Sequence, residues 1–436
     1  MVNVIIELSK YLIILLITLY TLFSFHYFRQ KDRKKQNFTI AYQRAIVVLF
    51  EIICYVVLFL EQENVKYLFF LFLQIIFFFA VTMIYERVYK NLSKLVLNHL
   101  LFLLSVGFIM QIRLDFSTGL KQFVMAAGCL ALCVAVPFVI ERFSYLASFG
   151  WFYAMGGIAL LASVFVFGVE KYGAKNWLSI GGFLLQPSEF VKILFVLFCA
   201  ALLSKANLNL KRILLISVVA AVHVGILVLE KDLGGALIFF ITYLFVLFAA
   251  TSNWLWLVLG TLAGSGAALI AYRFFSHVRV RVKAWWDPWS DIDNSGYQVA
   301  QSLFAIGTGG WFGMGLGRGL PESIPIVESD FIFSAISEEF GGIFCICILL
   351  VYLSCFLMFI NISMRFTNKF YKLTALGMSI IFIFQVFLAI GGVTKFIPST
   401  GVTLPLISNG GSSLLSTIIM FSIIQGLHVL QNKKSR

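Results

Sequence analysis

Charged residues are scarce in this sequence. Of its 436 residues, only 12% are Asp, Glu, Lys or Arg, and 61% are hydrophobic, whereas a soluble domain is about a quarter charged and about half apolar. This balance excludes a soluble globular protein. Because one bilayer crossing takes about 20 apolar residues, the composition fits about thirteen membrane spans and leaves no room for a large soluble domain.

Motifs built on cysteine are also missing. The seven cysteines all lie inside apolar runs, and none stands in a CxxC pair or at a metal-binding spacing from a histidine. We therefore expect small buried residues rather than a disulfide framework or a metal site. A cleavable signal is missing too, because residues 2–25 have almost no basic region before them and no small-residue cleavage site after them.

Long apolar runs take the place of these features. They predict an all-α polytopic membrane protein with about 13 transmembrane helices. The expected spans are 2–25, 43–61, 65–85, 95–112, 121–140, 150–169, 186–203, 213–229, 234–250, 254–272, 335–360, 374–394 and 412–430.

The basic excess of the chain indicates its orientation. The net charge is 33 − 20 = +13, which in another context would suggest nucleic acid. With the N-terminus outside, 19 of the 33 basic residues fall in the short inner loops and the tail 431–436, and the densest cluster is 29–35. Basic residues collect on the cytoplasmic side of membrane proteins, so we expect an outer N-terminus, a cytoplasmic C-terminus and no nucleic-acid partner.

Residues of about 273–334 form the only long stretch without a span. Trp285, Trp286 and Trp289, repeated glycines and several acids occur there, which is not the composition of a disordered linker. Long loops in compact chains are often functional. We therefore expect one long, ordered extracellular loop.

Two ionisable residues stand near the start of the expected span 186–203. Glu189 and Lys192 are three residues apart, so they share one face of a helix. They form either an interfacial ion pair that locates the span or a buried pair that lines a polar cavity, since charges at membrane depth mark substrate paths. The sequence leaves both interpretations open.

Two aspartates each precede an apolar run at the outer face. Asp232 stands where it could cap the next helix, and Asp330 stands directly before Phe331. Partial desolvation there would raise the pKa of Asp330 toward that of a usable base, but a helix cap explains its position equally well. Glu338 and Glu339 lie within the following apolar run, deeper than a loop should reach, so at least one of them is expected to face a polar interior.

Two further stretches are rich in glycine. The stretch 396–413 also carries proline and hydroxyl residues between two spans, and irregular backbone at membrane depth is tolerated only where it lines protein or water. We expect it to border the same polar cavity. The run 307–319 matches a GxGxxG pattern, but no strand or crossover helix surrounds it, which argues against a dinucleotide site. Lone polar residues inside spans are expected to be satisfied structural groups; these are Glu7, Glu51, His99, His223 and Gln385.

These stretches, taken in order, resemble the SEDS family of bacterial cell-wall proteins, which includes FtsW, RodA and SpoVE. The resemblance covers residues 93–430, or ten spans, and leaves 1–92 as an N-terminal extension with three transmembrane helices and 431–436 as a basic tail. The matching motifs are G-A-x-x-W…GG…QPSE-x-x-K at 173–192, D-L-G at 232–234, W-x-D-P-W-S-D…G-Y-Q…QS at 286–302, G-x-G-G-x-x-G-x-G at 307–315, S-D-F-I-F-S-x-I-S-E-E-x-G at 329–341 and P-x-T-G-x-x-L-P-x-I-S-x-G-G-S-S at 398–413.

The resemblance implies a peptidoglycan glycosyltransferase that polymerises lipid II on the outer face of the bacterial cytoplasmic membrane. It makes Asp330 the catalytic base, places Lys192 and Arg318 near the departing diphosphate, and makes Trp177 a surface for sugar stacking. The remaining supporting or substrate-binding positions are Glu189, Asp232, Gln298, Gln301, Glu338, Glu339, Ser412 and Ser413. No metal ligands are assigned and no cofactor is named, and a divalent cation is left open.

The resemblance also implies partners. Members of the family pair with a class B penicillin-binding protein, a transpeptidase, and work with other divisome or elongasome proteins. Division, elongation and sporulation are not distinguished by the sequence. Two alternatives are a lipid II flippase, which Glu338 and Glu339 keep open, and a non-catalytic scaffold. The chain departs from common family patterns at Ser329, where members often have His, and at Glu328, which adds a charge beside Asp330.

Overall fold

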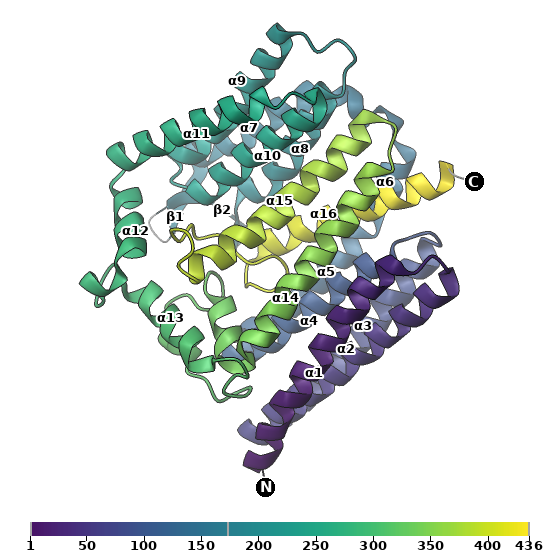
Figure 1. The fold of residues 1–436 in the computed structure, drawn as a ribbon, viewed down its shortest axis with the longest axis vertical. Coiled ribbons are helices and arrows are strands. Elements are labelled where there is room, and N and C mark those ends of the chain that lie inside the picture. The colour runs from purple at the N-terminus through teal and green to yellow at the C-terminus, as the bar shows by residue number, and fades with distance from the viewer. Residues whose placement is uncertain (1, 172–173, 435–436) are drawn as a thin grey trace.

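The computed structural model describes residues 2–171 and 174–434 of the chain. Helices form nearly all of it, as the apolar runs predict (Figure 1). Gly173, the first residue of one motif, and Arg436, the last of the basic tail, lie outside the described residues, as does Met1.

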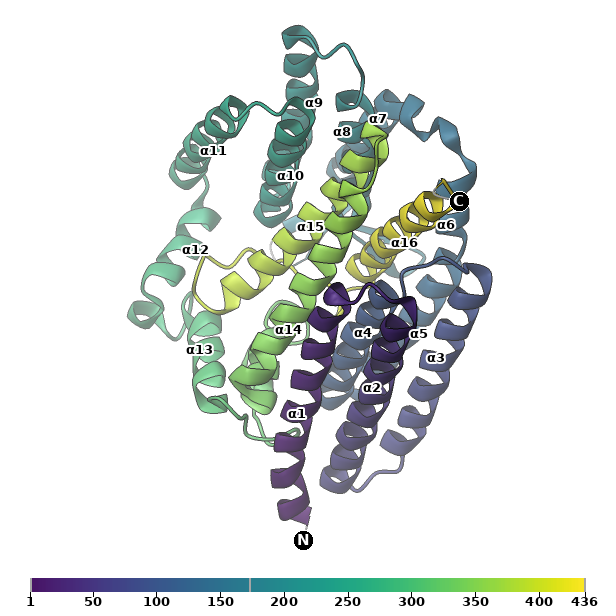
Figure 2. The same ribbon diagram turned by 45° about the vertical axis from the view of Figure 1, so that its right-hand side comes forward.

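Three helices precede the part of the chain that carries the motifs. They are α1 (Val2–Arg29), α2 (Arg33–Gln62) and α3 (Lys66–Val88), and they lie beside α4 (Lys94–Leu114) and α5 (Phe116–Cys133) (Figure 2). The apolar stretch of α4 is buried on all sides. The N-terminal helices supply hydrogen-bond partners for polar groups of α4. His99 Nδ1 lies 3.0 Å from Tyr20 Oη, and Ser105 donates a hydrogen bond to Glu51. The lone polar residues expected in these spans are therefore paired.

The remaining helices surround α14 and α15 (Figures 1 and 2). Short 3-10 helices occur at Ser144–Phe149, Pro288–Asp291 and Pro321–Ser323. The helices are α6 (Ala135–Arg142), α7 (Gly150–Phe167), α8 (Pro187–Leu203), α9 (Leu210–Leu229), α10 (Leu233–Thr251), α11 (Leu255–Phe274), α12 (Ser276–Trp286), α13 (Tyr297–Gly309), α14 (Ile332–Met364), α15 (Lys369–Val393) and α16 (Gly411–Lys434).

Twelve helical segments of the described chain are long and apolar enough to cross a membrane. The thirteenth expected span, 186–203, is α8, whose 17 residues reach the lower limit for a crossing. Most of its side chains are buried in the protein. It begins with Pro187 at its first position, where the missing N–H costs no helical hydrogen bond.

A small antiparallel sheet follows α7, which the sequence did not predict. It contains β1 (Gly168–Lys171), β2 (Ala174–Ile180) and β3 (Phe183–Leu185) in the order β1-β2-β3. Gly181 and Gly182 join β2 to β3 with φ values of 57° and 85°. Two residues with positive φ form the tight hairpin turn that matches the twist of the strands. This glycine pair was therefore the sequence signal for the hairpin.

The expected long loop between α11 and α14 is ordered, because it carries α12, α13 and a glycine run that packs into a kink of α14. The kink lies at Gly341, with φ 86° and ψ 170°. Gly342 N donates to Gly310 O at 2.8 Å, and Met314 N donates to Glu338 O at 2.9 Å. A Cβ at Gly341 would lie 2.4 Å from Gly313 N. The glycines therefore allow close contact between two backbones and do not form a phosphate loop.

Candidate functional site

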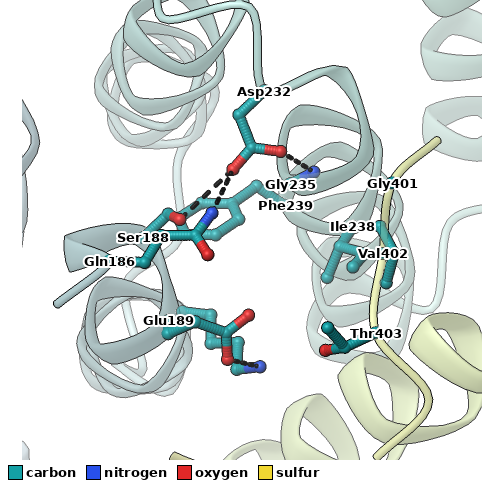
Figure 3. A pocket seen from close by; sticks show the side chains of 11 residues that line it. Gln186, Ser188, Glu189, Asp232, Gly235, Ile238, Phe239, Gly401, Val402 and Thr403 are labelled. Atoms are coloured by element: carbon teal, nitrogen blue, oxygen red, sulfur yellow. Dashed lines mark hydrogen bonds and ion pairs between the residues drawn. The ribbon is translucent and has the colours of Figure 1, made fainter. Parts of the chain in front are cut away.

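An open cavity lies among the start of α8, the start of α10 and the segment 401–403, and the empty space in and before it, open solvent included, is about 420 Å³ (Figure 3). Polar groups and a few apolar groups line it. The lining residues are Gln186, Ser188, Glu189, Lys192, Asp232, Gly235, Ile238, Phe239, Gly401, Val402 and Thr403.

Asp232 forms one wall of the cavity and also caps α10. Its Oδ1 accepts a hydrogen bond of 2.8 Å from Gly235 N, and its Oδ2 accepts bonds from Ser188 Oγ at 3.2 Å and from Gln186 Nε2 at 3.3 Å (Figure 3). Burial raises the pKa of this carboxyl, while the bond from the Gly235 amide opposes the rise. The cap and the cavity lining, which the sequence left as alternatives, are both present.

Lys192 places a buried cation on the opposite side of the cavity. It is 3% exposed, and its Nζ donates to Glu189 Oε2 at 2.6 Å and to Gln385 Oε1 at 2.9 Å. Ser416 Oγ donates to the same Glu189 oxygen at 2.7 Å. Glu189 and Lys192 are therefore an ion pair and cavity-lining residues together. Gln385, for which the sequence suggested no partner, orients this pair.

Hydroxyl groups in the first turn of α16 complete this wall. Ser412 Oγ accepts a bond of 3.0 Å from Gln186 N, and Ser413 Oγ lies 2.8 Å from Thr403 Oγ1. Gln385 Nε2 donates to Thr403 O at 3.1 Å. Ser412 and Ser413 thus contact residues that line the cavity, and they stabilise its wall without lining it.

Asp330 lies at the edge of the same cavity, next to Gly401. A Cβ built on Gly401 would be 3.6 Å from Asp330 Oδ2. Burial raises the pKa of Asp330, and a 3.1 Å hydrogen bond from Ser329 Oγ opposes the rise. The start of α14 shows no side-chain cap, and its capping position is Phe331. Asp330 is therefore not the helix cap that the sequence allowed.

The backbone before Asp330 is fixed by hydrogen bonds from two other segments. Gln111 Nε2 donates to Glu328 O at 2.7 Å, and Asn409 N donates to the same oxygen at 2.8 Å. Ser408 Oγ donates to Ser329 O. The position of the Asp330 carboxyl is thus set by α4 and by the segment 399–410 together.

Arg281 of α12 belongs to the site, although the sequence reasoning did not select it. Its Nη2 would lie 3.8 Å from a Cβ on Gly401, so it and Asp330 Oδ2 are both within 4 Å of one point. Its positive charge lowers the pKa of Asp330 and of Asp232 against the effect of burial. The sequence signal for Arg281 was its spacing from Trp285, four residues later, because this spacing puts both residues on one face of a helix. That face contacts the segment 395–399, where Trp285 donates to Lys395 O at 3.1 Å.

Six of the expected site residues are not brought to the cavity, namely Trp177, Gln298, Gln301, Arg318, Glu338 and Glu339. Trp177 lies in β2, and Gln298 and Gln301 lie on α13, which packs on α14. Arg318 pairs with Asn3 of α1 and with Glu61 of α2 at 3.5 Å. These two partners come from the N-terminal bundle, so Arg318 holds that bundle to the glycine run and does not reach the cavity.

Glu338 and Glu339 form a separate buried cluster with Arg113. Arg113 Nε lies 2.9 Å from Glu339 Oε1, and its Nη1 lies 2.8 Å from Glu322. Glu338 Oε1 accepts a bond of 3.1 Å from Leu320 N. The cluster braces the segment after the glycine run. These two glutamates face a polar interior, as expected, but that interior is protein and not the cavity.

Within residues 2–171 and 174–434, no three His, Cys, Asp or Glu residues gather as metal ligands. The cavity and its edge hold one buried cation, a second cation, and two aspartates whose carboxyl pKa values are raised. Such a set can accept a proton from a hydroxyl and stabilise negative charge on a leaving group.

Comparison with known proteins gives a consistent result. A family model described as FtsW/RodA/SpoVE cell cycle protein matches residues 92–433. The peptidoglycan glycosyltransferase RodA of Mycobacterium bovis is 38% identical over 315 residues, which is 68% of this chain and 67% of that protein. A probable peptidoglycan glycosyltransferase FtsW of Aliivibrio salmonicida is 34% identical over 61% of this chain and 69% of its own length.

Two solved structures share the fold. One is a chain from a peptidoglycan synthase complex that coordinates polymerization and crosslinking, with a TM-score of 0.66 and 25% identity over 77% of this chain and 97% of that one. The other is the rod shape determining protein RodA of Thermus thermophilus, with a TM-score of 0.57 and 24% identity over 77% and 96% of the two chains.

Proposed function

Since the chain belongs to the FtsW/RodA/SpoVE family of cell cycle proteins, we propose that it is a peptidoglycan glycosyltransferase that polymerises lipid II with Asp330 as its base. The observation that carries the proposal is the cavity, because it has the buried cation Lys192 on one side and Asp330, with a raised pKa, at its edge. Relatives named as peptidoglycan glycosyltransferases support the reaction class.

The proposed reaction uses these groups directly. Asp330 accepts the proton from the 4-hydroxyl of the acceptor sugar, and that oxygen bonds to the anomeric carbon of the donor. The bond from this carbon to the diphosphate oxygen breaks, and the electron pair leaves with the polyprenyl diphosphate. Lys192 and Arg281 stabilise the negative charge that develops on the leaving group. No step is routed through a metal ion.

The chain is a multi-pass protein of the cytoplasmic membrane, and we propose that the cavity opens on its outer face. The contact of Arg318 with Asn3 puts the start of α1 at the same end of the bundle as the glycine run. Basic residues crowd the other end, where Lys433 pairs with Glu141. By the positive-inside rule, this supports an outer N-terminus and a cytoplasmic C-terminus.

We further propose that residues 1–92 are an N-terminal extension of the polymerase and that its partner is a class B penicillin-binding protein. The family match begins at residue 92, after α3 ends. The complex among the similar structures coordinates polymerization with crosslinking, and crosslinking is transpeptidase chemistry. The match ends at residue 433, within the basic tail 431–436.

Polymerisation of lipid II by the purified protein with its partner tests the proposal. Asp330→Asn is expected to lower the rate by about 100-fold to 10,000-fold, which is the usual contribution of a general base. Asp293→Asn is the matched control, because Asp293 is an exposed carboxylate between α12 and α13. Full activity in Asp330→Asn would overturn the role of this residue.

The same preparation separates the alternatives. Lipid II translocation into liposomes that persists in Asp330→Asn would favour a flippase. A protein that folds and binds its partner but polymerises nothing would favour a scaffold. Both outcomes would contradict the proposed function.

A further inference from the structure

The helix α12 has two faces with different surroundings. The face that carries Arg281 and Trp285 contacts the protein, through Ser399 O at 3.4 Å and Lys395 O at 3.1 Å. Arg279, Lys283 and Trp286 are spaced by four and three residues, so they form one stripe on the helix. All three side chains are exposed, and Trp286 is 77% exposed. These side chains project away from the protein, apart from a 3.5 Å hydrogen bond from Arg279 Nη1 to Arg273 O.

The stripe lies where lipid headgroups are expected. The preceding helix α11 has no buried residue, so lipid surrounds most of it. Its last residue, Phe274, is 74% exposed, and α12 begins two residues later. A crossing helix of 20 residues ends at the bilayer surface, and therefore α12 starts there.

The charge of this region is of one sign. Residues 273–283 contain Arg273, Arg279, Arg281 and Lys283 and no acid. In the described part of the chain, none of these four forms an ion pair with a carboxylate. Basic residues beside an exposed tryptophan are typical of a segment that sits among headgroups, and each such basic residue favours an anionic surface.

We propose that the stripe Arg279, Lys283 and Trp286 is a binding site for the phosphate headgroup of an anionic glycerophospholipid in the outer leaflet. The two cations bind the phosphate, and the indole lies at the level of the glycerol backbone. Because Arg281 projects from the opposite face of the same helix to the edge of the cavity, a lipid held on the stripe also restrains Arg281 beside Asp330. The outer leaflet follows from the orientation proposed above, whereas the headgroup chemistry does not depend on the enzymatic function.

Retention of phosphatidylglycerol tests the site directly. The full-length protein is placed in nanodiscs with increasing fractions of phosphatidylglycerol in phosphatidylcholine, and bound lipid is counted by native mass spectrometry. The wild type is expected to retain phosphatidylglycerol in preference to phosphatidylcholine. Arg279→Gln with Lys283→Gln should weaken this retention by about fivefold per charge removed. The matched control is Lys121→Gln with Lys175→Gln, which removes two exposed charges away from α12 and should change nothing.

Three results would overturn the proposal. Equal retention by the α12 variant would show that the stripe holds no headgroup, and equal loss in the control variant would show a nonspecific charge effect. Loss of polyprenyl diphosphate binding with phosphatidylglycerol retained would assign the stripe to the substrate. A rise of polymerisation with phosphatidylglycerol in the wild type, but not in the α12 variant, would support the link to Arg281; if no polymerisation occurs, the retention measurement still decides the lipid site.

Discussion

The family motifs contain two clusters of buried charge, one at the cavity and one beside the glycine run. In the cavity, Lys192 pairs with Glu189 next to open space. In the other cluster, Arg113 pairs with the fully buried Glu339. The Nη2 atom of Arg113 also donates a hydrogen bond to Gly319 O at 3.1 Å. The first pair has room for a ligand, whereas protein atoms surround the second. Similar residue types at membrane depth therefore line the proposed catalytic cavity in one place and hold a loop in the other.

The comparison predicts opposite consequences for removing the cation. Water can enter the open cavity and hydrate a carboxylate that has lost its partner. Glu339 in the closed cluster is fully buried, so its carboxylate without a cation would carry the full free-energy cost of burial. Removing the cation of the cavity cluster should thus lower activity, and removing the cation of the closed cluster should lower stability.

Arg113→Gln should have the largest effect, on stability. It leaves Glu339 buried without a cation, which costs about 3–5 kcal/mol for a buried pair, and the thermal unfolding midpoint in detergent should fall strongly. Glu322→Gln is the control, because this partner of Arg113 is 54% exposed and an exposed pair contributes about 0–1 kcal/mol. Equal midpoints for both variants would contradict the structural role of the cluster.

Lys192→Gln should come next, and its effect should be on activity. We expect the rate of polymerisation to fall by about 100-fold or more, as for the loss of one group that stabilises developing charge. The unfolding midpoint should change little, because Glu189 keeps its bond from Ser416 and borders the open cavity. The exposed Lys175 supplies the control, Lys175→Gln. A variant at position 192 that unfolds but keeps its activity per folded molecule would reverse the comparison.

Glu230→Gln should have a smaller effect that depends on pH. Glu230 is buried directly after α9, and burial, with the nearby charge of Asp232, raises the pKa of this carboxyl from 4.5 to about 8. The folded protein therefore holds a proton that the unfolded chain releases, and stability falls as pH rises from about 4.5 through about 8. Glutamine mimics the neutral carboxyl, so the variant should lose less stability than the wild type between pH 6 and pH 9. Identical pH slopes of the unfolding midpoint would refute this assignment.

Arg318→Gln should have the smallest effect. Its pairs with Glu61 and Asn3 are partly exposed, so about 0–1 kcal/mol of stability is at stake. Polymerisation should be unchanged, because Arg318 does not line the cavity. A large loss of polymerisation would show instead that Arg318 reaches the diphosphate, as the motif predicts.

The helices and the cavity residues were predictable to different degrees. Apolar runs define where helices lie, because each crossing must satisfy its backbone internally. Asp232 and Lys192 could be selected from the sequence because a charged group at the start of an apolar run either caps a helix or lines a polar cavity. The sequence could not separate Glu189 from Glu338, since both are carboxylates at similar depth, and only the tertiary fold decides which one meets open space.

The unpredicted features depend on long-range contacts. Arg281 belongs to the site only because the segment 399–401 returns to α12, and no local pattern encodes that return. The glycine run resembled a ligand loop, but its partner is the kink at Gly341, about thirty residues later. A motif shows that small residues are needed at a position, and it does not show what approaches them.

The enclosure of α4 has a consequence for the order of membrane insertion. Its polar residues Asn98, His99 and Ser105 find acceptors and donors in Gln43, Tyr20 and Glu51. All three of these partners precede α4 in the chain and enter the bilayer first, whereas Ser354, the other partner of His99, is made some 250 residues later. The helices α1 and α2 can therefore shelter the polar side of α4 from lipid tails while the ribosome completes the rest of the protein.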